Sequence, residues 1–136
     1  MIELLEHTGN DRVAIFSLGN MLPLAREIAG ALALEGVAAA VINARFAKPV
    51  DAAMIAQFAR SAEILVTLED HAMAGGFGSA VLEELNRLGL GTPVLRIGWP
   101  DQFIEHGKPD ELRKKYGISA EAVLAQLRQQ LGIPVL

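Results

Sequence analysis

The chain has 136 residues, a formal net charge of −4 and no cysteine. A negatively charged chain without a basic stripe argues against nucleic-acid binding, and the missing thiols exclude disulfides, cysteine nucleophiles and zinc–thiolate sites. No apolar run approaches the roughly 20 residues that span a bilayer, and no signal-peptide pattern opens the chain. We therefore expect a cytoplasmic protein with neither a nucleic-acid nor a membrane partner.

Hydrophobic residues make up 51% of the chain, a high share for a small domain. Such a composition is typical of a parallel sheet that is buried on both faces, or of a surface that a partner covers, and we expect both. The length suits one domain over residues 1–136, with no internal repeat and no long linker.

The first half of the chain alternates strand and helix patterns. In chain order, the expected elements are an edge strand at Ile2–Leu5, a buried strand at Val13–Leu18, a helix from Leu24 to Gly36, a strand at Val37–Ile42 and a short helix capped by Asp51. The edge strand is expected to run antiparallel to the rest.

The second half continues the alternation. The expected elements are a strand at Ile64–Leu68, a helix from Ser79 to Gly89, a strand at Pro93–Ile97, a short helix from Asp110 to Lys115 and a last helix from Ser119 to Gly132. Ser119 is a favourable N-cap, and Ile118 and Val123 have the spacing of a hydrophobic staple. Strands separated by helices of this length predict right-handed crossovers and a three-layer α/β/α sandwich.

The stretch from Ile64 to Leu85 holds the main chemical candidates. A buried strand is followed by Glu69, Asp70 and His71, then by a glycine turn, and then by the helix that starts at Ser79. In open α/β sheets, functional groups gather at the carboxyl ends of strands, so position alone makes this stretch a candidate active site.

The triplet Glu69-Asp70-His71 has two interpretations. It could be an acid–base site in which a carboxylate orients the histidine. Adjacent residues of a strand or turn point in different directions, however, and the chain has neither a G-x-S-x-G motif nor a cysteine nucleophile. We therefore favour a polar strand end that contacts another domain or subunit.

The turn formed by Gly75, Gly76, Phe77 and Gly78 also has two interpretations. Its backbone N–H groups could bind a phosphate at the start of a helix. The turn lacks the lysine of a P-loop, and Val81 stands where a G-x-G-x-x-G motif needs its third glycine. Positive φ angles or close packing of the helix explain the glycines better.

Other polar and aromatic residues give weaker signals. The histidines His7, His71 and His106 lie far apart and do not have the spacing of metal ligands. Two loops, Asn43–Val50 and Trp99–Gly107, carry large apolar or cationic residues that suggest packing against the domain body or a partner, although solvated connectors remain an alternative for each.

Three segments, taken together, resemble one enzyme family. They are NARFAKPVD (Asn43–Asp51), LVTLEDHAMAGGFGSAV (Leu65–Val81) and PDQFIEHG (Pro100–Gly107). Their order is similar to the C-terminal domain of 1-deoxy-D-xylulose-5-phosphate synthase, which belongs to the transketolase-like, thiamine-diphosphate-dependent superfamily. The resemblance runs from about Asp11 to Leu131. This sequence departs from the family where Trp99 replaces a usual leucine and where Asp70-His71 replaces a common Glu-Asn, which weakens any specific role for His71.

The resemblance implies a five-stranded, mostly parallel mixed sheet with one antiparallel strand. It also implies that thiamine diphosphate and Mg²⁺ are bound by two other domains of the parent enzyme, which carry a G-D-G motif that this sequence lacks. We therefore expect no catalytic, cofactor-binding or metal-binding residue here. The chain is interpreted as an excised C-terminal domain or a stand-alone homologue, inactive when isolated, with Met1 as a non-native or re-initiated start.

By the same resemblance, the parent enzyme condenses pyruvate with glyceraldehyde 3-phosphate, with loss of CO2, in isoprenoid and thiamine precursor synthesis. This domain would pack on the catalytic domains of its own chain and help to form a homodimer. The residues expected at interdomain or subunit contacts are Arg45, Glu69, Asp70, His71, Gly75, Gly76, Gly78, Asp101 and His106.

Three alternatives stay open. The chain could be the C-terminal part of a split transketolase or of a 2-oxoacid dehydrogenase β-subunit. It could be a regulatory module that binds an anion at Gly75–Ser79. It could also be a small independent enzyme that uses Glu69 and His71.

Overall fold

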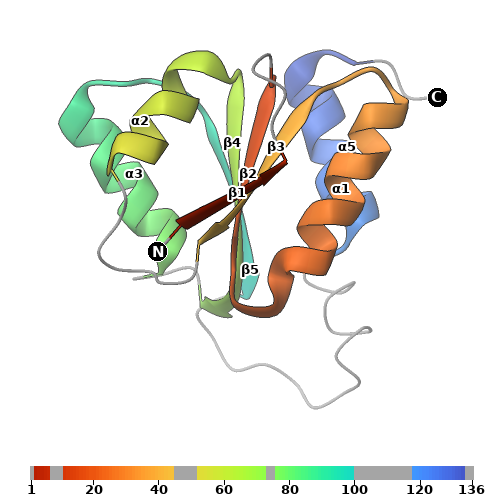
Figure 1. The fold of residues 1–136 in the computed structure, drawn as a ribbon, viewed down its shortest axis with the longest axis horizontal. Coiled ribbons are helices and arrows are strands. Elements are labelled where there is room, and N and C mark those ends of the chain that lie inside the picture. The colour runs from red at the N-terminus through yellow and green to blue at the C-terminus, as the bar shows by residue number, and fades with distance from the viewer. Residues whose placement is uncertain (1, 7–10, 45–51, 73–75, 100–117, 134–136) are drawn as a thin grey trace.

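A computed structural model describes residues 2–6, 11–44, 52–72, 76–99 and 118–133 (Figure 1). Strands and helices alternate through these residues. The strands are β1 (Ile2–Glu6), β2 (Val13–Leu18), β3 (Ala39–Ala44), β4 (Ile64–Ala72) and β5 (Val94–Trp99). The helices are α1 (Leu22–Leu34), α2 (Ala52–Ser61), α3 (Phe77–Leu88) and α5 (Ala120–Leu131), and a 3-10 turn at Gly19–Met21 leads into α1.

The strands form one sheet in the order β1-β3-β2-β4-β5. Strands β3, β2, β4 and β5 are parallel to one another, whereas β1 pairs antiparallel with β3 at one edge. The predicted α/β class with a parallel sheet is confirmed. Strand β2 lies at the centre, and all six of its residues are buried, which explains its uninterrupted run of mostly apolar residues.

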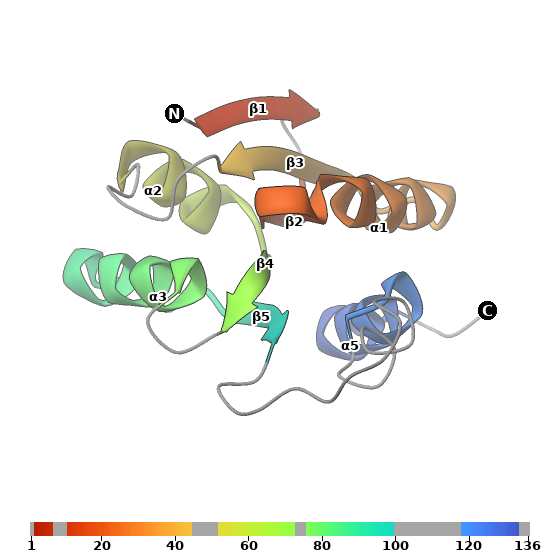
Figure 2. The ribbon, with the colours of Figure 1, turned by 90° about the horizontal axis from the view of Figure 1, so that it is seen from below.

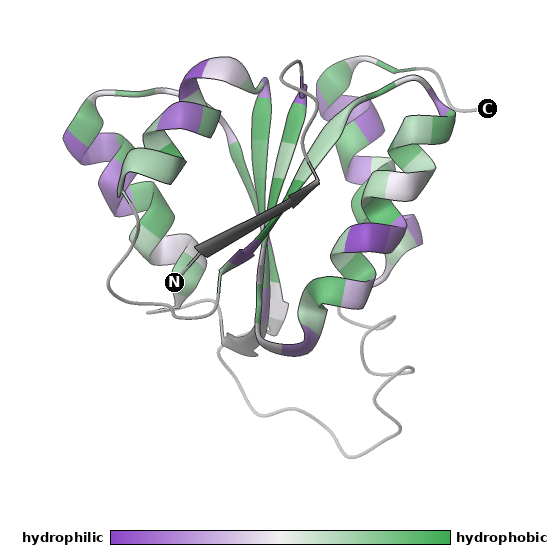
Figure 3. Cartoon of the chain, viewed as in Figure 1, coloured by the Kyte–Doolittle hydropathy of each residue, from purple (hydrophilic) through white to green (hydrophobic). Residues whose placement is uncertain are grey.

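Helices cover both faces of the sheet. Helices α1 and α5 lie on one face, and α2 and α3 lie on the other (Figures 1 and 2). Colouring by hydropathy shows apolar strands between helices whose polar residues lie mainly away from the sheet (Figure 3). Each helix thus buries an apolar stripe against the strands, as the predicted three-layer arrangement requires.

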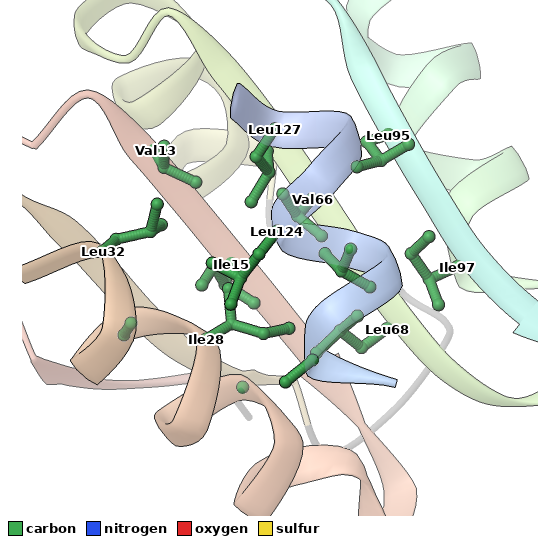
Figure 4. Packing of buried hydrophobic residues seen from close by; sticks show 14 of the residues in the cluster. Val13, Ile15, Ile28, Leu32, Val66, Leu68, Leu95, Ile97, Leu124 and Leu127 are labelled. Atoms are coloured by element: carbon green, nitrogen blue, oxygen red, sulfur yellow. The ribbon is translucent and has the colours of Figure 1, made fainter. Parts of the chain in front are cut away.

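The alternation of strand side chains divides the core into two clusters. On the face of α1 and α5, Val13 and Ile15 of β2 pack with Val66, Leu124 and Leu127 (Figure 4). The opposite face contains the intervening residues of the same strands, so each strand of the parallel sheet contributes to both clusters.

The second cluster is built around three phenylalanines. Phe16 of β2 contacts Phe58 of α2 edge to face, with ring centroids 6.2 Å apart, and Phe77 of α3 at 6.1 Å. All three side chains are almost completely buried. Phe77 is the first residue of α3, so the start of this helix is fixed against the central strand by packing.

Several predicted helix ends are confirmed. The side chain of Ser119 accepts a hydrogen bond from the N–H of Ala122 at 3.2 Å, as expected of an N-cap. Ile118 and Val123 are both buried in the cluster below α5, in agreement with a staple. Gly89 and Gly132 end α3 and α5 in the left-handed conformation.

Other boundaries differ from the prediction. Strand β3 starts at Ala39 rather than Val37, because pairing with Val13 of β2 begins there. Strand β4 continues beyond Leu68 to Ala72, and α3 begins at Phe77, two residues before Ser79. The predicted helix at 110–115 and the cap at Asp51 lie outside the described residues.

Candidate functional site

The structure describes some of the predicted site residues and not others. Arg45, Gly75, Asp101 and His106 lie outside the described residues. Asp70 and His71 belong to the backbone of β4, but their side chains are not among those described. Three residues of the predicted site can therefore be placed with their contacts, and these are Glu69, Gly76 and Gly78.

The triplet Glu69-Asp70-His71 lies within β4 and not after it. On one side, Glu69 pairs with Leu18 of β2 in regular register. On the other side, Leu68 pairs with Ile97 and Ala72 with Trp99, so three residues of β4 oppose one residue of β5. The pairing of β4 with β5 is therefore irregular at the triplet, as it is at a β-bulge.

Glu69 is fully buried and binds the start of α3. Its two carboxylate oxygens accept hydrogen bonds from the backbone N–H groups of Phe77 and Gly78, the latter at 2.8 Å. The N-cap residue Gly76 has no side chain that could do this. A carboxylate at the positive end of a helix is favourable, so Glu69 caps α3 from a neighbouring strand.

Gly78 is required by close packing. A Cβ atom added at this position would lie 2.7 Å from Arg96 Nε, 2.9 Å from Thr67 Oγ1 and 3.0 Å from Glu69 Oε2. Distances of this size are too short for a carbon atom. Of the two explanations of the glycine turn, close packing therefore holds at Gly78, whereas Gly76 has an ordinary φ of −90°.

Two strand residues that the sequence analysis did not single out complete this site. Thr67 of β4 and Arg96 of β5 are paired across the two strands and lie on the α3 side of the sheet. Arg96 donates a hydrogen bond to the hydroxyl oxygen of Ser79 at 2.8 Å. A polar residue within each of two otherwise apolar strand runs was the available signal for this polar cluster, which we define as Thr67, Glu69, Ser79 and Arg96.

The polar cluster does not have the arrangement of an acid–base site. Both oxygens of Glu69 are engaged by backbone N–H groups, and the residue has no exposed surface from which to reach a substrate. The same carboxylate occupies the N–H groups that a phosphate would need at the start of α3. This arrangement disfavours both the small-enzyme and the anion-binding alternatives.

Glu69 and Gly78 are both buried within the described part of the chain. Both residues make their contacts inside this chain, through the capping bonds and through the close approach of α3 to β4 and β5. The contact of the full set of site residues with another domain or subunit stays a prediction.

Among the described residues, no group of three or more histidine, aspartate or glutamate side chains could hold a metal ion. No helix in the described part of the chain is both long and apolar enough to cross a membrane.

Comparisons with known proteins agree with this fold. Residues 3–123 match the family "Transketolase, C-terminal domain". The chain is 57% identical over 125 residues to the 1-deoxy-D-xylulose-5-phosphate synthase of Acidobacterium capsulatum, covering 92% of this chain and 20% of that protein. It is 56% identical over 132 residues to the enzyme of the same name from Methylacidiphilum infernorum, covering 97% of this chain and 21% of that one.

A solved structure described as a split gene transketolase, inactive beta4 tetramer, superposes with a TM-score of 0.85. It is 36% identical, and the match covers 98% of this chain and 43% of that one. The chain spans about a fifth of the length of the curated relatives it matches. It belongs to the transketolase C-terminal domain family and is homologous to the C-terminal portion of 1-deoxy-D-xylulose-5-phosphate synthases.

Proposed function

We propose that the chain is the third domain of a 1-deoxy-D-xylulose-5-phosphate synthase that acts in the cytoplasm. The parent enzyme would condense pyruvate with glyceraldehyde 3-phosphate and release CO2, using thiamine diphosphate and Mg²⁺ bound by other domains. Identity above 50% over nearly the whole chain supports this assignment. In this proposal the chain spans residues 1–136 as a single structural domain with no catalytic residue of its own.

The domain's role in this proposal is to pack on the catalytic domains and to contribute to a homodimer. The observation that carries it is that the buried carboxylate of Glu69 makes its hydrogen bonds inside this chain. Glu69 is engaged by the start of α3, so the most prominent chemical candidate serves the fold. In this proposal the segment around Glu69 and Gly78 meets another domain or subunit. The other residues of this contact would be Arg45, Asp70, His71, Gly75, Gly76, Asp101 and His106.

A chimera tests this proposal. The chain replaces the C-terminal region of the Acidobacterium capsulatum enzyme, to which it is 57% identical, and product formation from pyruvate and glyceraldehyde 3-phosphate is measured. We expect an active, dimeric chimera and no turnover by the isolated chain. Activity of the isolated chain would contradict the proposal, as would a folded chimera without activity.

The second candidate is the C-terminal part of a split transketolase or of a 2-oxoacid dehydrogenase β-subunit. It is favoured by the likeness to the split gene transketolase, at 36% identity and a TM-score of 0.85. Co-purification of the chain with a separately encoded thiamine-diphosphate-binding subunit, followed by ketol transfer between sugar phosphates, would favour this candidate over the first.

A further inference from the structure

The start of α3 has the properties of a carboxylate-binding site. The first N–H groups of a helix have no partner within the helix and attract anions. In α3, the N–H of Phe77 donates to one oxygen of Glu69 and the N–H of Gly78 donates to the other at 2.8 Å. The ligand of this site is therefore a side chain from β4, a different element of the fold.

A hydroxyl and a guanidinium group approach the same glycine, Gly78, as this carboxylate does. Thr67 Oγ1, Arg96 Nε and Glu69 Oε2 all lie within 3.0 Å of the point that a Cβ atom of residue 78 would occupy. Thr67 has no exposed surface, and its hydroxyl has no hydrogen-bond partner among the described residues. A hydroxyl and a positively charged group therefore lie near the start of α3, in addition to its backbone N–H groups.

We propose that Phe77 N–H, Gly78 N–H, Thr67 and Arg96 form a binding site for a small monocarboxylate, and that Glu69 is its tethered ligand. Because the carboxylate of Glu69 is separate from these donor groups, a substitution of Glu69 removes the ligand and leaves the donors in place. Glu69→Ala removes one CH2 group and the carboxylate, which together correspond to acetate. The proposal stands whether or not the docking role of the domain holds.

The tether has a structural consequence. Glu69 is the first residue of the irregularly paired part of β4, and Phe77 is the first residue of α3. The hydrogen bond between them joins the strand to the start of the helix, and the ring of Phe77 adds packing against Phe16. Glu69 thereby acts as a positioning residue for both segments.

Chemical rescue tests the proposal. The melting temperature and the hydrogen exchange of the Phe77 and Gly78 amides are measured for wild type, Glu69→Ala and the control Glu63→Ala, in acetate or chloride at equal pH and ionic strength. Glu63 is a suitable control because its carboxylate is largely exposed and pairs with Arg12 at the surface. Propionate serves as a ligand with one CH2 group too many.

In chloride, Glu69→Ala should lower the melting temperature and speed exchange of the two amides on the order of tenfold to a hundredfold, the range for losing a hydrogen bond to a charged group. Acetate should restore both in a concentration-dependent manner, because it binds the folded state. Propionate should restore them less, and wild type and Glu63→Ala should not respond.

Two results would overturn the proposal. One is a Glu69→Ala protein that behaves alike in acetate and chloride, and the other is an equal response to acetate in all three proteins. If Glu69→Ala does not fold in chloride, the yield of folded protein after refolding is compared between acetate and chloride. Recovery in acetate alone supports the site, and equal failure in both salts contradicts it.

Discussion

Arg128 of α5 donates two hydrogen bonds to one carboxylate oxygen of Glu35, the residue that ends α1. The donors are Nε at 2.9 Å and a terminal nitrogen at 2.6 Å. The Glu35 side chain is only 7% exposed, and its other oxygen is buried without a hydrogen-bond partner among the described residues. The pair links the two helices that cover one face of the sheet.

Removal of Arg128 alone should be costly. Arg128→Ala leaves a nearly buried carboxylate without its cation, at a helix C-terminus where negative charge is already unfavourable. We expect a loss of about 3 kcal/mol in the free energy of unfolding, measured by urea denaturation. The double variant Glu35→Ala/Arg128→Ala should lose less than the single variant does, and a double-mutant cycle measures the difference. Additive losses would show that the pair has no coupling energy.

Gly78→Ala and Gly30→Ala should have opposite effects. At Gly78 the added methyl group meets Arg96, Thr67 and Glu69 at 2.7–3.0 Å, so we expect a loss of about 1–3 kcal/mol from overpacking. Gly30 lies in α1 with no atom within 4 Å of an added Cβ, so alanine there should stabilise by about 0.5–1 kcal/mol. Urea denaturation of both variants provides the comparison, and a stabilising Gly78→Ala would argue against the close approach.

Phe77→Ala should disrupt the second core cluster. The Phe77 side chain has no exposed surface and packs on Phe16, so truncation should cost about 3–5 kcal/mol. Leu34→Ala is the control, because Leu34 is 90% exposed and its truncation should change stability by less than about 0.5 kcal/mol. Thermal unfolding followed by circular dichroism distinguishes the two. A similar loss in both variants would contradict the assigned core.

The ion pair between Arg12 and Glu63 predicts a small acid dependence of stability. The hydrogen bond from Arg12 lowers the pKa of Glu63 in the folded state. A lowered pKa gives stability that is present above the unfolded-state pKa and is lost as the pH falls through the folded-state pKa. Both side chains are more than one-third exposed, so the contribution should be at most about 1 kcal/mol and should shrink in salt.

Glu63→Gln should remove this part of the acid dependence. Free energies of unfolding are compared for wild type and variant from neutral pH down through the usual glutamate range. The difference between the two proteins should narrow toward low pH. A difference in the free energy of unfolding that does not change with pH would show that the substitution acts through something other than the ionisation of Glu63.

The alternation of strands and helices could be predicted because each element carries its own apolar period and its own end signals. Ser119 with Ile118 and Val123 is an example in which adjacent residues suffice. The predicted end of β4, at Leu68, was wrong. The prediction stopped there because the next three side chains, Glu69-Asp70-His71, are polar. Pairing to Leu18 of β2 and Trp99 of β5 extends the strand through its backbone, whatever the side chains are.

The role of Glu69 could not be predicted for a related reason. Its position after a run of apolar residues was visible in the sequence. Its partners, however, are the backbone N–H groups of Phe77 and Gly78, and every residue except proline has such a group. Thr67 and Arg96 come together only through the register of β4 and β5. The pairing of distant strands therefore determines which side chains meet at this site, whereas the local sequence pattern determines the strands and helices themselves.

The strand order has a consequence for folding on the ribosome. Strand β2 lies at the centre of the sheet, and its two neighbours, β3 and β4, are both synthesised after it. The parallel part of the sheet can therefore grow outward from β2 as the chain emerges, ending with β5. Strand β1 is made first but must wait for β3 before it has a partner. A nascent chain that stops before β3 thus exposes two unpaired strands, which is the stage most open to misassociation.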